Sequence, residues 1–132
     1  MSKIRASVTQ ILGGEGLHIV SFTHAQQTLT MMGLELPDIK VGSEVVLNIK
    51  PSSVGIAKNY SGDFSFSNRL KATITRIDIG EILCVLKLSI SPETQIESLL
   101  TASSAKKINL SKNDEVDAFF KASELSIHEV LK

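Results

Sequence analysis

An internal repeat constrains the fold of this chain more than any other feature. The segment Ile4–Ile11 aligns with Leu70–Ile77, residue type by residue type, at a separation of 66 positions. Two further blocks align in the same order at a separation of 71 positions: Val41–Val45 with Lys112–Val116, and Lys50–Val54 with Lys121–Leu125. The same order at nearly constant separation predicts two related modules, over residues 1–60 and 61–132. The turn-forming segment Lys58–Asp63 is predicted to link them.

Most of each module alternates apolar and polar residues, as half-buried strands do. Two strand pairs are predicted to turn at Gly13–Gly16 and at Asp78–Glu81, where glycine supplies positive-φ positions. Further strands are expected over Val45–Ile49 and Val116–Phe120. One helix is expected over Pro92–Leu100, with Ser91 as its N-cap, and a short turn over Thr101–Lys107. The prediction is a mainly all-β protein, made of two tandem OB-like small β-barrels with a short helix.

Composition excludes several classes of protein. Fourteen Lys and Arg balance 14 Asp and Glu, so no net positive charge attracts nucleic acid or an anionic membrane. The single cysteine cannot form a disulfide framework, which suits a reducing cytoplasm. No apolar run approaches the length of a membrane span, and the N-terminus has no signal-peptide pattern. We therefore expect a cytoplasmic protein with no membrane partner, and a module this small favours oligomerisation.

The repeat also carries a pattern of hydrogen-bond donors. Each copy has a lysine at the end of a hydrophobic strand, followed by small and hydroxyl residues, in Lys50–Ser53 and Lys121–Ser123. Ammonium, hydroxyl and free backbone N–H groups suit a deprotonated oxyanion, which accepts hydrogen bonds and donates none. Similar donors occur in Thr101–Ala105 and Ser65–Asn68. Solvated strand ends, a helix cap and a polar linker are the alternative interpretations of the same residues.

No arrangement of residues predicts catalysis or a resident metal. His18 and His24 lack a ligand-spaced carboxylate cluster, and Cys84 lies in an apolar strand. The turn Gly13–Gly16 precedes a strand, whereas a dinucleotide loop precedes a helix. No set of nucleophile, base and orienting residue is present. We therefore expect a protein that is not an enzyme.

Three motifs of the second module resemble those of the Mop or TOBE family of molybdate-binding modules. The matching segments are Ser65–Ala72, Leu100–Ala105 and Val116–Ser123, and the resemblance covers nearly the whole chain as two copies. The family implies OB-like barrels that bind molybdate or tungstate as a ligand without chemistry. Two-copy versions resemble the cytoplasmic molybdenum-storage proteins called molbindins, which form trimers with anions held between subunits. A homotrimer for molybdenum storage, buffering or homeostasis is therefore the leading hypothesis.

The resemblance also implies a set of oxyanion-binding residues. The second copy supplies Ser65, Phe66 and Ser67 from the first motif, Thr101, Ser104 and Ala105 from the middle motif, and Lys121, Ala122 and Ser123 from the last. The first copy supplies Lys50, Ser52 and Ser53 from the last motif, and Ser2 and Lys3 from the first. The metal enters only as its oxyanion. Thr30–Leu34 is aligned with the middle motif, and keeps its threonine.

Four positions depart from the family pattern. Ser67 stands where the family has arginine, Glu124 adds a carboxylate beside Ser123, Pro51 removes a backbone donor, and the Thr30 segment lacks the Ser-Ala pair. Two other hypotheses therefore remain. The first is a degenerate interaction or regulatory module that binds a protein partner without an anion. The second is OB-like nucleic-acid binding, for which zero net charge and few aromatic residues offer little support.

Overall fold

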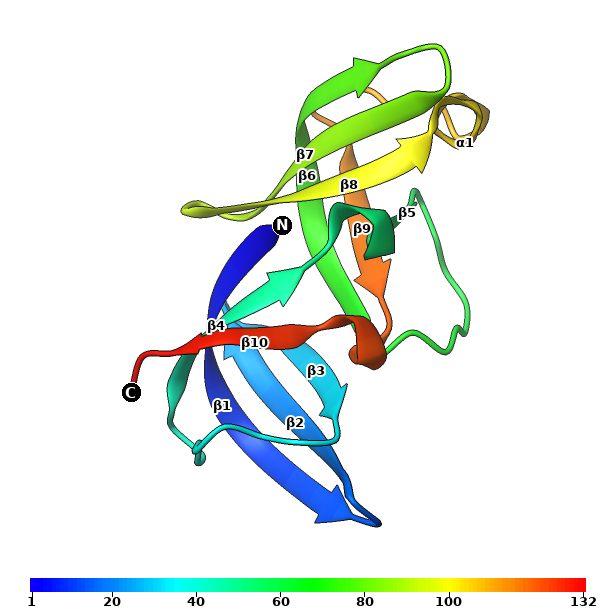
Figure 1. Ribbon diagram of the computed structural model, residues 1–132. Helices are drawn as coiled ribbons and strands as arrows, with labels where there is room; N and C mark the ends of the chain where they lie inside the picture. The colour runs from blue at the N-terminus through cyan, green and yellow to red at the C-terminus, as the bar shows by residue number, and fades with distance from the viewer.

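The computed structural model describes all residues from 1 to 132 and contains two five-stranded antiparallel sheets (Figure 1). The first sheet has the order β10-β4-β1-β2-β3, with β1 (Ser2–Gly14), β2 (Leu17–His24), β3 (Gln27–Gly33), β4 (Glu44–Ile49) and β10 (Ser126–Val130). The second has the order β5-β9-β6-β7-β8, with β5 (Gly55–Ala57), β6 (Asn68–Ile79), β7 (Leu83–Ser91), β8 (Thr94–Thr101) and β9 (Glu115–Phe120). The remaining elements are helix α1 (Ala102–Lys107) and the 3-10 turns η1 (Pro51–Ser53) and η2 (Ala122–Glu124).

The repeat in the sequence appears in the register of the sheets. In the first sheet Val8 pairs with Phe22, and the ladder then shifts by a β-bulge before Gln10. In the second sheet Ile74 pairs with Leu88, and the same shift occurs before Arg76. The two pairs are 66 positions apart in sequence, so the aligned blocks hold equivalent places. Both sheets are curled, and the predicted class of mainly β, OB-like modules is confirmed.

Each sheet takes its outer strand from the other half of the chain. Strand β5 follows the first four strands in sequence, but it pairs with β9 of the second sheet. Strand β10, at the C-terminus, pairs with β4 of the first sheet (Figure 1). The sequence pattern did not predict either short strand. The first half of the chain supplies β5 to the second sheet, and the second half supplies β10 to the first sheet. Each half therefore completes the sheet of the other.

One hydrophobic core spans both halves. Twenty-five buried residues form a single cluster, which includes Phe22 and Leu29 from the first sheet and Leu88, Ile96 and Phe120 from the second. Burying a side chain of this kind stabilises a fold by about 1.5–3 kcal/mol. The two sheets are therefore expected to depend on each other for stability.

Where the two halves meet, polar side chains form hydrogen bonds to the other half of the chain. Asn68 is fully buried, and its amide group accepts from the N–H of Thr30 at 2.7 Å and donates to the carbonyl of Thr30 at 2.9 Å. Gln27 accepts from the N–H of Lys71 at 2.7 Å. His24 contacts the carbonyl of Arg5 through Nδ1 at 2.6 Å and Ser91 Oγ through Nε2 at 2.9 Å. The contacts of Asn68, Gln27 and His24 with Thr30, Lys71 and Ser91 join the two halves. The contact of Asn68 is the costliest to lose, because a buried polar group is costly to leave unpaired.

The helix predicted over residues 92–100 is wrong, because these residues form a turn and strand β8. Pro92 and Glu93 lie in the tight turn between β7 and β8. The strand buries Ile96 and Ser98 on one face, at a period of two residues. The pattern of N-cap, proline and acidic residue, which is typical of a helix start, here belongs to a hairpin. Pairing along the whole length of β7 decides the conformation.

The other turn predictions hold in part. Gly16 has a φ of +75°, as the first hairpin requires, and Glu15 beside it has a φ of 55°. Gly80 is not in the positive-φ region, so the second hairpin does not use its glycine in this way. The short turn expected over residues 101–107 is helix α1, and Thr101 is its N-cap. No helix in the structure is long and apolar enough to cross a membrane.

Candidate functional site

The two Lys-Ser segments singled out in the sequence lie against each other. Lys50 is the N-cap of η1 and Lys121 is the N-cap of η2, and both residues are exposed. A hydrogen bond joins the turns, because Ser53 Oγ donates to Glu124 Oε2 at 3.0 Å. Ser52 and Ser123 are also exposed, whereas Ala122 is half-buried. The fold thus gathers the last motif of both copies at one place.

The segment before β6 joins this place from the side. Phe66 is half-buried and packs edge-on against Phe119 of β9, with ring centroids 5.0 Å apart. The ammonium of Lys121 lies 5.8 Å from the centroid of the Phe66 ring, within the range of a cation–π contact. Ser65 and Ser67, on either side, are exposed. The first and last motifs of the second copy are therefore neighbours within one chain.

The middle motif lies elsewhere. Thr101 Oγ1 accepts from the N–H of Ser104 at 3.0 Å and donates to Ser104 Oγ at 2.9 Å. This arrangement caps α1 and leaves the Ser104 hydroxyl hydrogen available, while Ala105 is fully buried in the core. Helix α1 lies at the far end of the second sheet from η2 (Figure 1). A single chain does not bring the middle motif to the other two.

The N-terminal residues of the first copy are already engaged in the fold. Ser2 is only 7% exposed, and its Oγ accepts from the N–H of Glu97 at 2.8 Å. Lys3 donates from Nζ to Asn48 Oδ1 at 2.9 Å. Ser2 and Asn68 hold equivalent places in the repeat, and both bond to the backbone of the opposite half. Their contacts have a structural role.

The alignment of Thr30 with the middle motif is wrong. Thr30 pairs with Ser21, and the equivalent pair in the second sheet is Lys87 with Glu97. Leu34, just past the end of β3, is the residue that matches Thr101 in position. No helix follows β3, whereas α1 follows β8 directly. The first half therefore lacks a middle motif altogether.

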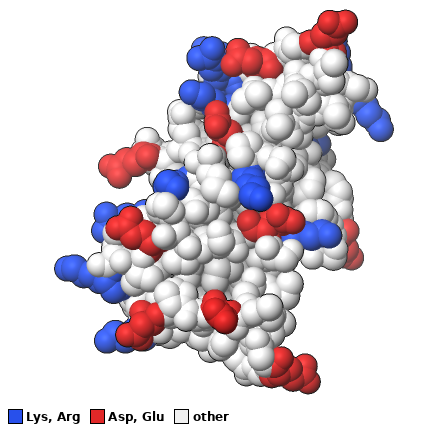
Figure 2. All heavy atoms as spheres, viewed as in Figure 1, with Lys and Arg blue, Asp and Glu red and all other residues white.

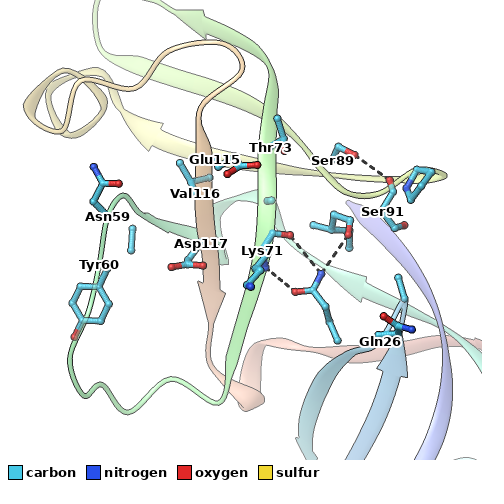
Figure 3. Close-up of a pocket in the computed structure, with 16 residues that line it drawn as sticks. Gln26, Asn59, Tyr60, Lys71, Thr73, Ser89, Ser91, Glu115, Val116 and Asp117 are labelled. Atoms are coloured by element: carbon cyan, nitrogen blue, oxygen red, sulfur yellow. Dashed lines mark hydrogen bonds between the residues drawn. The ribbon is translucent and has the colours of Figure 1, made fainter.

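Two grooves on the surface do not contain the predicted residues. The first has a volume of about 970 Å³ and lies beside β6 and β9, with Lys71, Glu115 and Asp117 on its wall (Figure 3). The second is about 680 Å³, and Arg5 and Glu44 are among its lining residues. Carboxylates in both grooves oppose a doubly charged anion. The grooves are open surfaces of the β-sheets, and they are not the predicted oxyanion site.

Charges on the surface are mixed, and four ion pairs form among them. Lysine and arginine lie among aspartate and glutamate on the face shown in Figure 2. The Ser7 hydroxyl, and after it the Arg5 guanidinium, hold the pKa of Glu44 below its ordinary range. The Lys58 ammonium, followed by the N–H of Ser111, does the same to the pKa of Asp114. The interactions of Glu44 and Asp114 stabilise strand ends and the linker.

Cys84 is buried in the core, as the sequence predicted. Burial raises the pKa of its thiol, and the charge of Asp78 adds to the effect. A thiol in this environment stays protonated at neutral pH. Cys84 therefore belongs to the packing.

Two roles were missed in the sequence. Glu124 was recognised as an added carboxylate, but its bond to Ser53 across the two turns was not foreseen. The repeat held the clue, because the alignment of Lys50–Val54 with Lys121–Leu125 places Ser53 on Glu124. The role of Asn68 as a bridge to Thr30 had no equivalent clue, since a buried asparagine cannot be distinguished from a turn residue by sequence alone.

These features define a class: a tandem pair of OB-like half-barrels with a donor-rich pair of turns where the halves meet. Comparison with known proteins agrees. Residues 65–127 match the family model described as TOBE domain. This match over the second half of the chain confirms the resemblance to the TOBE domain family seen in the sequence.

A solved structure has the same fold over almost its full length. It is the cytoplasmic molybdate-binding protein ModG, in a form with molybdate bound. The TM-score is 0.89, the sequence identity is 23%, and the match covers 95% of this chain and 93% of that one. At this identity the likeness establishes the fold of both halves. No curated protein matches this chain significantly in sequence.

Proposed function

We propose that this chain binds molybdate or tungstate reversibly and serves as a cytoplasmic store or buffer of the anion. The observation that carries the proposal is the gathering of two Lys-Ser turns and the Ser65–Ser67 segment at one place in a ModG-like fold. Molybdate is a fully deprotonated tetrahedral dianion, so it needs donors and positive charge. Lys121, Ser123 and the backbone around Ala122 would supply them. The chain would act by binding alone, without catalysis.

The two halves would contribute unequally. In the second half Phe66, which lies between Ser65 and Ser67, contacts Lys121, so that half offers the fuller site. In the first half Pro51 lacks an N–H, and Ser2 and Lys3 are engaged elsewhere. The predicted modules, 1–60 and 61–132, would thus be sister copies of which the second is the main binder.

A second copy of the chain would complete the site. Thr101, Ser104 and Ala105 lie away from η2, so only another subunit can bring this motif to an anion held there. Ile82 is 75% exposed and Leu83 is 51% exposed, and the carbonyl of Ile82 accepts from the N–H of Ala102 at the start of α1. Apolar residues beside the isolated motif favour an intersubunit contact there. The proposed assembly is a homotrimer.

Calorimetric titration of the purified protein with molybdate, tungstate and sulfate tests the proposed ligand. Saturable heat with the first two anions and none with sulfate is the expected result, because a fitted site distinguishes anion size. Absence of heat with all three would overturn the proposal. Light scattering with and without molybdate tests the assembly, and a monomer under both conditions would overturn the trimer.

A second function, docking of a protein partner without an anion, is favoured by one contact. The carboxylate of Glu124 accepts the hydrogen of the Ser53 hydroxyl. Ser67 stands where the family has arginine, so the positive charge of that arginine is absent. The two functions are separated by Lys121→Ala and Ser104→Ala. If neither substitution changes the molybdenum content of protein purified from molybdate-fed cells, the partner function gains.

A further inference from the structure

Ser53 and Glu124 occupy the same place in the two copies, and they bond to each other. Ser53 is the last residue of η1 and Glu124 is the last residue of η2. In both turns this residue donates its N–H to the carbonyl of the N-cap lysine, at 3.0 Å in each case. The two equivalent side chains therefore meet each other where the turns make contact. A fully symmetric pair of turns would place two like residues in contact here.

The asymmetry introduces a carboxylate at the centre of a donor-rich surface. Glu124 is the one acidic residue among Lys50–Ser53 and Lys121–Glu124. It forms no ion pair with either lysine, because the four ion pairs of the protein lie elsewhere. It accepts the Ser53 hydroxyl, and that hydroxyl has one hydrogen to give. Ser53 therefore cannot donate to a bound anion while the contact persists.

We propose that the Glu124 carboxylate is an internal competitor, which competes with the oxyanion for the Ser53 hydroxyl. This residue thereby sets how tightly the chain binds the anion. The inference rests on the proposed function, and it concerns the regulation of the same site. A bound dianion must displace the Glu124 carboxylate from Ser53 or lie beside it and bear its repulsion. Either way, affinity is lower than the same turns would give with a neutral residue at position 124. A weakened site suits a protein that releases its anion again.

The test is a set of titrations with molybdate on the full chain. Glu124→Gln keeps the size of the side chain and removes its charge, so affinity should rise about tenfold, as expected for one like charge a few ångströms from a dianion in a solvated site. Glu93→Gln is the matched control, because Glu93 is an exposed glutamate with no hydrogen bond in the β7–β8 turn. It should change affinity less than twofold.

A double-mutant cycle tests the hydrogen bond itself. Ser53→Ala should change affinity less than twofold in the native chain, where the hydroxyl is already occupied. In the Glu124→Ala background, where the hydroxyl is free, the same substitution should weaken binding several-fold. Thermal unfolding of each variant checks that the fold is intact.

The outcomes separate the two claims. If the native chain binds and Glu124→Gln matches the Glu93→Gln control, the competitor role is overturned and the proposed function stands. Equal effects of Ser53→Ala in both backgrounds would also overturn it. If Glu124→Gln binds and the native chain does not, the competitor role is supported and the proposed function of the native chain is overturned. If no variant binds, the proposed function fails, and the competitor role fails with it.

Discussion

The two halves of this chain agree in their long strands and differ in the segments at the strand ends. The bulge after Val8 recurs after Ile74, and each half closes with a 3-10 turn and a strand that joins the opposite sheet. Helix α1 comes directly after the third long strand of the second half, and nothing similar comes after β3. Packing requires the strands to stay alike, because one core fills both sheets. The turns and strand ends bear no such requirement, and the residues of the candidate site differ between the copies there.

The largest expected effect comes from equivalent core truncations in the two halves. Phe22→Ala should cost about 3–5 kcal/mol of unfolding free energy and Leu88→Ala about 2–5 kcal/mol, because both side chains are fully buried. Since the core is continuous, each variant should lower a single unfolding transition, followed by calorimetry and circular dichroism. Two separate transitions would show that the halves fold independently.

The next comparison concerns the two N-cap lysines. Lys121→Ala should weaken molybdate binding by one to two decades, since a hydrogen bond to a charged group contributes roughly 1.5–3 kcal/mol. Lys50→Ala should have a smaller effect, because Pro51 beside it lacks a donor. Isothermal titration of both variants measures the difference. Equal losses would show that the copies contribute alike.

A prediction of intermediate effect on stability compares the two exchanged strands, β5 and β10. Gly55 of β5 packs under Phe119, and a Cβ there would lie 2.6 Å from the ring. Ser126 is the equivalent residue of β10, where Asn48 replaces the phenylalanine and leaves room for a side chain. Gly55→Ala should therefore destabilise by about 1–3 kcal/mol in urea denaturation. Gly14→Ala is the control, because nothing lies within 4 Å of the added atom.

The smallest effect concerns two equivalent glutamates. Glu44 accepts from Ser7 at 2.8 Å and pairs with Arg5 at 3.2 Å, and its pKa is lowered from the ordinary value of 4.5. The folded state binds this proton less readily than the unfolded state, so the contribution to stability is present above pH 4.5 and fades as the pH falls through the folded pKa.

Glu44→Gln should therefore reduce stability at neutral pH slightly and flatten its dependence in the acid range. Glu115, the equivalent residue of β9, forms no side-chain hydrogen bond, so Glu115→Gln should reduce stability at neutral pH less than Glu44→Gln does. Thermal melts between acid and neutral pH compare the two variants. A larger loss of stability at neutral pH for Glu115→Gln than for Glu44→Gln would contradict the assignment.

Much of the fold was predictable because it repeats a local pattern. The alternation in Ile4–Ile11 and Leu70–Ile77 predicted β1 and β6, and the two glycine-containing turns located both hairpins. Strand β8 was missed because Pro92 and Glu93 imitate a helix start, and only pairing with β7 overrides that preference. The Lys-Ser turns were found as candidate donors from composition and repetition. Their participation in binding stays a prediction.

The sequence by itself determined the duplication, the mainly β character and the positions of the donor turns, because these depend on residue type and on short-range periodicity. The tertiary structure alone decided which sheet received β5 and β10, and which side chain faced Ser53. Those outcomes depend on contacts between residues far apart in the chain, whose free energy no local pattern encodes. The bond between Ser53 and Glu124 joins residues 71 positions apart, and it lies where the two halves exchange their final strands.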